Sequence, residues 1–258
     1  MAIITLTTDW RNDDFYVGAI KGRILSQCPD ATIVDITHKI ESYKSAHAAF
    51  ILRGTFPHFP AGTIHLLCTN SEISEKRIPL CISYKGQFFI GCDTSAMKVM
   101  FSEQPEKVVV LSPQQFVNST FPELTILAQA ACMLANGALP DDIGVDATDE
   151  YSILELSPSC TSDSISGHVI YIDSYKNIIT DITREQFESV CGNRKFEVVV
   201  KNETYTITHI SRTYSEVRTG ELVALFNSLG LLEIAMRDAF LATLANIECN
   251  NPVLVKIL

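Results

Sequence analysis

The sequence has no CxxC pair among its eight cysteines, no apolar run long enough to span a membrane, and few basic side chains. Its 20 lysines and arginines are outnumbered by 30 aspartates and glutamates, and the net charge of -10 argues against nucleic-acid binding. No basic region followed by an apolar one opens the chain, which argues against secretion. The scattered cysteines indicate a reduced, cytoplasmic protein without a disulfide framework, and no histidine or cysteine spacing suggests a metal site.

The composition is that of a compact folded protein, with 47% hydrophobic and 19% charged residues, and 258 residues favour two domains. Strand and helix patterns alternate up to about residue 150, which predicts a largely parallel sheet covered by helices on both faces. The expected strands are residues 3–8, 31–36, 63–68 and 107–112, with a hairpin over 78–92 that turns at Gly86. The expected helices are residues 14–24, 42–52 and 124–134, the last ending near Asn136 and Gly137.

A polar stretch at residues 156–164 marks a domain boundary, and mostly strand patterns follow it. The strands are expected at residues 168–172, 178–182, 196–201, 204–210, 221–227 and 253–257, with one helical stretch around 236–246. This pattern predicts a small antiparallel, barrel-like domain. The predicted organisation is therefore an α/β domain over residues 1–156 and a β domain over 165–258.

The N-terminal stretch of residues 1–22 combines an apolar strand, carboxylates and a helix start. Asp9 stands where the strand leaves the sheet, the place where open α/β sheets bind ligands, and its carboxylate suits a ribose diol. Asp14 is placed to cap the next helix. Turn and cap roles for these acids are the alternative, and spacing alone favours that alternative.

Five segments in the same order resemble the S-adenosylmethionine hydroxide adenosyltransferases, whose relatives include the fluorinase and the chlorinase. They are TTDWRNDDFYVGAIKG, CPDATIVDITHKI, FPAGTIHL, IDSYKNIITDI and FNSLGLLEIAMRDA. The resemblance runs over nearly the whole chain. It implies an α/β domain joined to a β-barrel domain, a homotrimer, and a nucleoside bound between the N-domain of one subunit and the C-domain of the next. S-adenosylmethionine or adenosine would then be the substrate or ligand, with no separate cofactor.

In the N-terminal half, the resemblance assigns four residues to the ligand. Asp9 matches the family's ribose-binding aspartate, and Asp14 matches the aspartate that holds the methionine ammonium. Tyr16 lies beside them in sequence, and Tyr43 stands where the halogenases have an aromatic residue over the sugar. Trp10 replaces a smaller or aromatic residue of the relatives, and it either narrows the pocket or caps the core.

In the C-terminal half, the resemblance assigns Asp173 and Asn177 to the methionine end of the ligand. Tyr214 matches the aromatic residue that stacks on adenine, and Asn227 with Ser228 matches part of the loop at the adenine edge. An aromatic face suits both adenine and a cationic sulfonium. Without the resemblance, Tyr214 reads as a core residue of the β domain.

The catalytic set departs from the family. The relatives have an aspartate and an arginine in a segment like VDPGVGTxRR and a histidine in STFHGRD; here Asn70 replaces the aspartate, Arg77 is kept and Pro122 replaces the histidine. An amide orients a water molecule but cannot take its proton, and proline has no polar side chain. The halogenases carry an insertion where this chain has only the turn at Gly86, so the hydrolase branch is the one resembled.

Three functions stay open on this sequence: an S-adenosylmethionine hydrolase with a rearranged catalytic set, a non-catalytic nucleoside or S-adenosylmethionine binder, and a structural trimer with a decayed pocket. Hydrolysis needs a carboxylate in place of the lost groups, and the first candidate is Glu123, with Asn70 and Arg77 orienting the water or polarising the ligand. Glu72 and Glu75 are the other candidates. The favoured alternative is that all three glutamates are solvated loop residues. His38 is expected to have a packing or hydrogen-bonding role.

Overall fold

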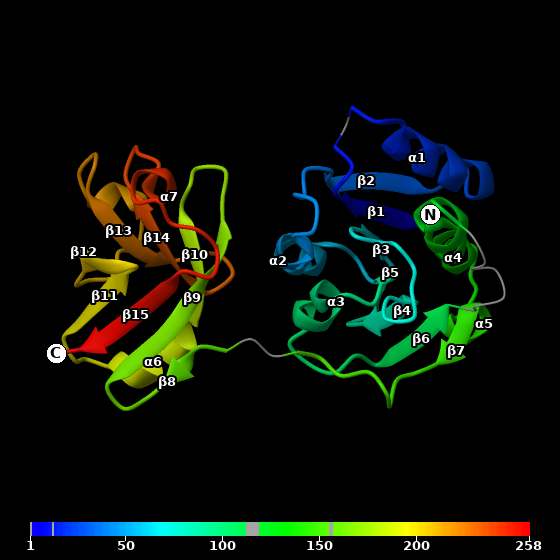
Figure 1. Cartoon of the computed structure of the whole chain (residues 1–258). Helices are drawn as coiled ribbons and strands as arrows, with labels where there is room; N and C mark the ends of the chain where they lie inside the picture. Colours follow the sequence, from blue (N-terminus) through cyan, green and yellow to red (C-terminus); the bar gives the residue numbers. More distant parts are fainter. Residues whose placement is uncertain (1, 12, 112–118, 155–156) are drawn as a thin grey trace. The chain divides into compact units, whose positions relative to one another are not determined.

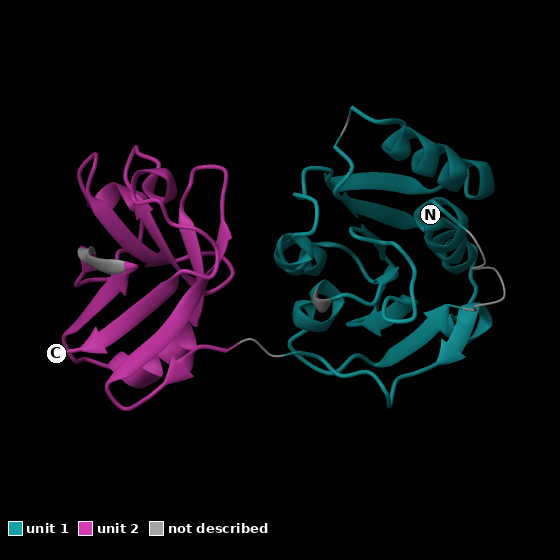
Figure 2. Ribbon diagram, viewed as in Figure 1, with its two compact units in different colours: residues 1–155 teal, residues 156–258 magenta. Residues whose placement is uncertain are grey.

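The computed structural model describes residues 2–11, 13–111, 119–154 and 157–258 (Figure 1). The chain divides into two compact units, residues 1–155 and 156–258, coloured separately in Figure 2. The exact limits of the predicted boundary segment stay a prediction. None of the helices in the described part of the chain is long and apolar enough to cross a membrane.

The N-terminal unit is built on a seven-stranded sheet with the order β2-β1-β3-β5-β4-β6-β7. The strands are β1 (Ile3–Thr8), β2 (Thr32–Thr37), β3 (Ile64–Cys68), β4 (Pro79–Tyr84), β5 (Gln87–Cys92), β6 (Lys107–Leu111) and β7 (Gly144–Asp146). Strands β2, β1, β3 and β5 pair in parallel, while β4, β6 and β7 pair antiparallel on one side of the sheet. The predicted α/β fold and the hairpin at Gly86 are confirmed; β7 was not predicted.

Helices cover both faces of this sheet, as predicted. They are α1 (Phe15–Gln27), α2 (Ser45–Thr55), α3 (Ser95–Met100), α4 (Ala128–Ala135) and α5 (Pro140–Ile143), with a 3-10 turn η1 (Phe56–His58) and a π-helical turn η3 (Glu123–Leu127). Alternate residues of each strand point to opposite faces. Leu66 of β3 therefore packs in one core with α1 and α4, and Leu67 packs in a second core with α2 and α3.

The C-terminal unit is an antiparallel sheet with the order β12-β11-β15-β9-β10-β14-β13, and β8 pairs with β9. Its strands are β8 (Ser159–Cys160), β9 (Ser164–Ile172), β10 (Ile178–Thr183), β11 (Phe196–Val200), β12 (Asn202–Ile207), β13 (Leu222–Phe226), β14 (Leu231–Met236) and β15 (Pro252–Ile257). Helices α6 (Arg184–Cys191) and α7 (Leu241–Leu244) and a 3-10 turn η4 (Tyr214–Glu216) complete it. The edge strands β12 and β13 come close together, so the sheet nearly closes and the predicted barrel-like domain is confirmed.

One local prediction in this unit is wrong, and one helix was not predicted. Residues 236–246 are not one helix, because strand β14 runs to Met236 and only Leu241–Leu244 is helical. The turn between them has Asp238 at a φ of 57°, which a helix cannot accommodate. Helix α6 was missed, although its capping box is visible in the sequence: the Thr183 hydroxyl accepts from the Gln186 N–H at 3.2 Å.

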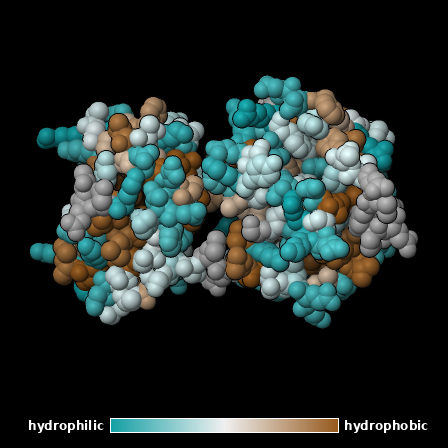
Figure 3. Space-filling model, viewed as in Figure 1, coloured by the Kyte–Doolittle hydropathy of each residue, from teal (hydrophilic) through white to brown (hydrophobic). Residues whose placement is uncertain are grey.

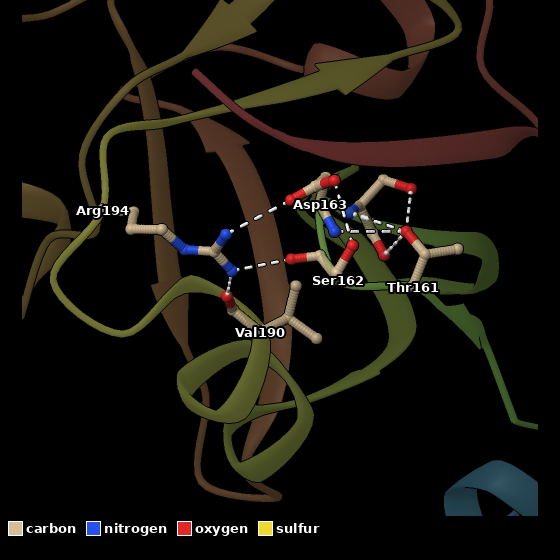
Figure 4. Close-up of polar contacts among 6 residues, drawn as sticks. Thr161, Ser162, Asp163, Val190 and Arg194 are labelled. Carbon is tan, nitrogen blue, oxygen red and sulfur yellow. Dashed lines mark hydrogen bonds and ion pairs between the residues drawn. The ribbon is translucent and has the colours of Figure 1, made fainter.

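Polar contacts at the surface join α6 to the turn between β8 and β9 (Figure 4). The Arg194 guanidinium donates to the carbonyl oxygens of Val190 and, at 2.7 Å, Ser162, and it pairs with Asp163 at 3.3 Å. Polar and neutral residues cover most of the face in Figure 3, with hydrophobic residues in smaller brown patches. All eight cysteines are free and six are buried, but Cys160 is exposed, so the prediction that the cysteines are core residues is wrong there.

Candidate functional site

The carboxyl ends of the parallel strands carry the predicted N-terminal site. Thr8 of β1 pairs with Cys68 of β3, so the two chains leave the sheet side by side. Asp9 follows Thr8, and its carboxylate accepts a hydrogen bond of 3.3 Å from the Asn70 backbone N–H. Burial raises the pKa of the Asp9 carboxyl above its ordinary 3.8, although the Asn70 N–H acts against this shift.

A connected series of polar side chains contacts Thr8 at the end of β1. The Thr8 hydroxyl and the His38 Nδ1 lie 2.9 Å apart, and the His38 Nε2 lies 3.2 Å from the Asp35 carboxylate. Lys21 donates to the same carboxylate at 2.6 Å. The predicted hydrogen-bonding role of His38 is therefore confirmed, and it holds the residue that precedes Asp9.

Arg77 holds Asn70 in place. Its Nη1 donates to the Asn70 side-chain oxygen at 2.7 Å and to the Asn70 backbone oxygen at 3.3 Å. Asn70 has a φ of 50°, a left-handed conformation that asparagine tolerates better than most residues. The Nη2 of Arg77 also lies 3.8 Å from the carboxylate of Glu72, whose side chain is 83% exposed. The structure thus brings together Asp9, Asn70 and Arg77 as one connected group.

Glu123 begins the π-helical turn η3 and is only 7% exposed. Burial raises the pKa of its carboxyl above the ordinary 4.5, and the nearby charge of Asp9 adds to this shift, while the Ser71 side chain acts against it. Glu72 and Glu75 are exposed. The alternative that all three glutamates are solvated is therefore wrong for Glu123. Two carboxyl groups, Asp9 and Glu123, share one partly desolvated environment.

Three half-buried aromatic rings pack together beside these carboxylates. The ring centroids of Trp10 and Phe121 lie 5.4 Å apart, those of Tyr16 and Phe121 5.2 Å, and those of Trp10 and Tyr16 5.9 Å. Trp10 follows Asp9 in the chain, and Phe121 lies two residues before Glu123, so the rings flank both acids. Trp10 also packs against the core, in line with a capping role. Phe121 was not predicted as a residue of the site, although its position next to Pro122 in the sequence could have indicated it.

The structure does not join Asp14 and Tyr43 to this group through any hydrogen bond among the described residues. Asp14 occupies the predicted N-cap position of α1, but its side chain makes no capping hydrogen bond and is exposed. Tyr43 is 86% exposed and has a φ of 67°. Their predicted contacts with a ligand stay predictions.

The C-terminal unit holds the other predicted residues in two polar groups. The Asp173 carboxylate accepts from the Asn177 N–H at 2.8 Å and from the Asn177 side-chain amide at 3.1 Å, which closes the turn between β9 and β10. The Tyr214 hydroxyl donates to Glu233, and the Asn227 amide donates to the same carboxylate at 3.2 Å. Ser228 is exposed on the turn that follows β13.

Glu233 was missed by the sequence reasoning. It is 4% exposed within strand β14, whose sequence is LLEIAM. A single acid inside an apolar strand was the available signal, because a buried carboxylate needs dedicated hydrogen-bond donors. No group of three or more His, Cys, Asp or Glu side chains in the described ranges could hold a metal ion.

Both units are similar in sequence to known protein domains. Residues 4–144 match the model of the SAM hydroxide adenosyltransferase N-terminal domain, and residues 167–254 match that of the C-terminal domain. An (R)-S-adenosyl-L-methionine hydrolase from Methanocaldococcus jannaschii is 28% identical over 245 residues, covering 90% of this chain and 88% of that protein. A fluorinase from Nocardia brasiliensis is 24% identical over 290 residues, covering 99% of this chain and 97% of its own length.

Among solved structures, an uncharacterized conserved protein from Thermotoga maritima superimposes with a TM-score of 0.86 at 23% identity. The match covers 99% of this chain and 100% of that one, and it shows a shared fold. Because the two domain models together match most of the chain in order, the protein belongs to the S-adenosylmethionine hydroxide adenosyltransferase family.

Proposed function

We propose that the protein binds S-adenosylmethionine and hydrolyses it to adenosine and methionine, with Glu123 accepting the proton of the attacking water. The observation that carries this proposal is the buried carboxyl of Glu123, which lies near Asp9. The pKa of the Glu123 carboxyl is raised above 4.5. A general base works best when its pKa lies nearer the working pH than that of an exposed carboxylate. Relatives named (R)-S-adenosyl-L-methionine hydrolase support the choice of reaction.

The proposed reaction is a displacement at the 5′ carbon by water. Water attacks the 5′ carbon of the ribose, a carbon–oxygen bond forms, and the carbon–sulfur bond breaks with its electron pair going to sulfur. The water proton passes to Glu123. The sulfonium is positively charged and the methionine thioether is neutral, so the negative charges of Asp9 and Glu123 suit the substrate. Asn70, held by Arg77, is the group proposed to orient the water.

A non-catalytic binder is the second candidate, and the contact between Asn70 and Arg77 favours it. Arg77 already occupies the Asn70 side-chain oxygen, at 2.7 Å, and an amide cannot take a proton. Pro122 offers no replacement for the family histidine. A variant carrying both Asn70→Asp and Pro122→His separates the candidates, because a gain of adenosine release would mean that the pocket lost only its water-handling groups.

The protein is also proposed to assemble as a homotrimer. Three exposed apolar side chains of the C-terminal unit support this: Tyr175 at 70%, Phe240 at 59% and Leu244 at 64% exposure. They lie in one region, because the Ala242 N–H of α7 donates to the Lys176 carbonyl of the β9–β10 turn at 3.0 Å. Light scattering that gives the mass of one chain would contradict the proposal. A cytoplasmic location stays a prediction from the cysteine pattern.

The test of function is incubation of purified protein with S-adenosylmethionine, following adenosine and methionine by chromatography, alongside calorimetry with adenosine. Equal release of both products establishes the hydrolase. Adenosine binding without any turnover favours the binder. Absence of both binding and turnover contradicts the proposed function.

A further inference from the structure

Glu233 is a buried carboxylate without a cationic partner. It is 4% exposed, and no lysine, arginine or histidine of the described ranges forms an ion pair with it. Two side-chain donors meet its two oxygens instead: the Tyr214 hydroxyl on Oε1 and the Asn227 amide, at 3.2 Å, on Oε2. Burying a charge is costly unless hydrogen bonds replace its water, so these two donors offset part of the desolvation cost of Glu233.

The contact with Tyr214 fixes an otherwise exposed ring. Tyr214 lies on the short turn η4 and is 44% exposed, so part of its ring is open to a ligand while its hydroxyl is held. Burial raises the pKa of the Tyr214 phenol above 10, and the hydrogen bond and charge of Glu233 raise it further. The hydroxyl therefore stays protonated and keeps donating at neutral pH.

The contact with Asn227 fixes a turn. The Asn227 side-chain oxygen accepts from the N–H groups of Leu229 at 3.0 Å and Leu231 at 3.2 Å, so it closes the connection between β13 and β14. Its amide nitrogen is the group that donates to Glu233. One carboxylate thus orients both the ring and the turn, and ordering them before binding lowers the entropic cost of binding.

We propose that Glu233 is a positioning residue, which holds the Tyr214 ring for stacking on the adenine of the ligand and holds the Asn227 turn at the adenine edge. The identity of the ligand rests on the proposed function. The anchoring itself rests only on the contacts among Glu233, Tyr214 and Asn227.

The test uses the full-length variants Glu233→Gln and Tyr214→Phe and their double variant, with Glu197→Gln and Tyr205→Phe as controls in the same unit. Adenosine affinity by calorimetry should fall about tenfold in Glu233→Gln and about fivefold in Tyr214→Phe. The double variant should bind no more weakly than Glu233→Gln, because both changes break one contact. In turnover assays, KM for S-adenosylmethionine should rise by the same factors while kcat stays unchanged, and the controls should match wild type.

A second readout needs no ligand. Ultraviolet difference titration against Tyr214→Phe isolates the phenol of Tyr214, which should ionise at lower pH in Glu233→Gln than in wild type. An unchanged titration overturns the anchoring, whatever the ligand is. Should Glu233→Gln fail to fold, Tyr214→Phe decides, since unchanged adenosine affinity in that variant also overturns the proposal. Wild type that binds no adenosine contradicts the proposed function, whereas binding that neither variant weakens contradicts this inference alone.

Discussion

Asp9 and Glu123 are two carboxyl groups held near each other without a lysine or arginine bonded to either in the described part of the chain. Burial raises the pKa of both, and Asp9 adds to the shift of Glu123. Arg77, which contacts the Asn70 side chain next to Asp9, is engaged with Asn70 and Glu72. A positively charged ligand would relieve this unfavourable pair, which is the physical reason to expect stronger binding of S-adenosylmethionine than of neutral adenosine.

Replacing Asp9 tests the ribose contact. In Asp9→Ala, the buried ribose diol loses its acceptor, and we expect affinity for adenosine to fall by roughly 2 to 4 kcal/mol. Calorimetry with adenosine measures the change. The exposed neighbour Asp13→Ala should bind as wild type does, and unchanged affinity in Asp9→Ala would place the ligand elsewhere.

Glu123→Gln should change stability in a pH-dependent way. Because the pKa of Glu123 is raised above 4.5 in the folded protein, its stabilising contribution is present below pH 4.5 and is lost as the pH rises through the folded value. The glutamine variant should therefore exceed wild type in free energy of unfolding by about 1 kcal/mol at pH 8, with the gain shrinking toward pH 4.5. Urea unfolding at several pH values measures this. A variant less stable than wild type at pH 8 would contradict the assignment, and the exposed Glu72→Gln serves as control.

The strands of the N-terminal unit could be predicted because their apolar runs are continuous, as burial on both faces requires. The π-helical turn η3 could not be predicted. Its residues were read as part of the helix at 124–134, and the turn that places Glu123 in a buried position depends on tertiary packing. Strand β14, with the sequence LLEIAM, was not predicted, because a short apolar run fits either a strand or a helix. Sequence thus identified Glu123 as a candidate, while its burial came only from the fold.

Strand β3 also carries a buried histidine, His65, whose pKa leaves it uncharged at neutral pH. The His65 Nδ1 lies 2.8 Å from the Thr5 hydroxyl, its Nε2 lies 2.7 Å from the Gln87 side-chain oxygen, and its ring stacks on Phe89. Burial lowers the pKa of His65 to about 4 from its ordinary 6.5. The histidine is therefore a pH-sensitive element of this sheet.

Stability should fall as this histidine is forced to charge. The contribution of His65 is present above pH 6.5 and is lost as the pH falls toward about 4, for a total of about 3 kcal/mol. Urea unfolding between pH 7 and pH 4.5 should show a shallower pH dependence in His65→Gln than in wild type. The exposed His209→Gln should keep the wild-type slope. Equal slopes in all three proteins would show that His65 does not titrate in this range.

At the level of the entire chain, the residues proposed to contact the ligand are divided between two units. Asp9 and Glu123 belong to residues 1–155, while Tyr214, Asn227 and Glu233 belong to residues 156–258. The resemblance assigned the residues that match family motifs, such as Asp9 and Tyr214. Glu233 lies within one of the resembling segments, FNSLGLLEIAMRDA, but the resemblance attached no role to it, and its contacts with Tyr214 and Asn227 are seen only in the fold.

The release of adenosine and methionine from S-adenosylmethionine, measured side by side for wild type, Glu123→Gln and Glu72→Gln, tests the proposed hydrolysis most directly. We expect wild type to form both products in equal amounts and Glu123→Gln to be slower by about 100-fold, since a general base contributes on that order. Glu72→Gln, on the exposed loop, should keep the wild-type rate. A Glu123→Gln variant that releases both products at the wild-type rate would contradict the account.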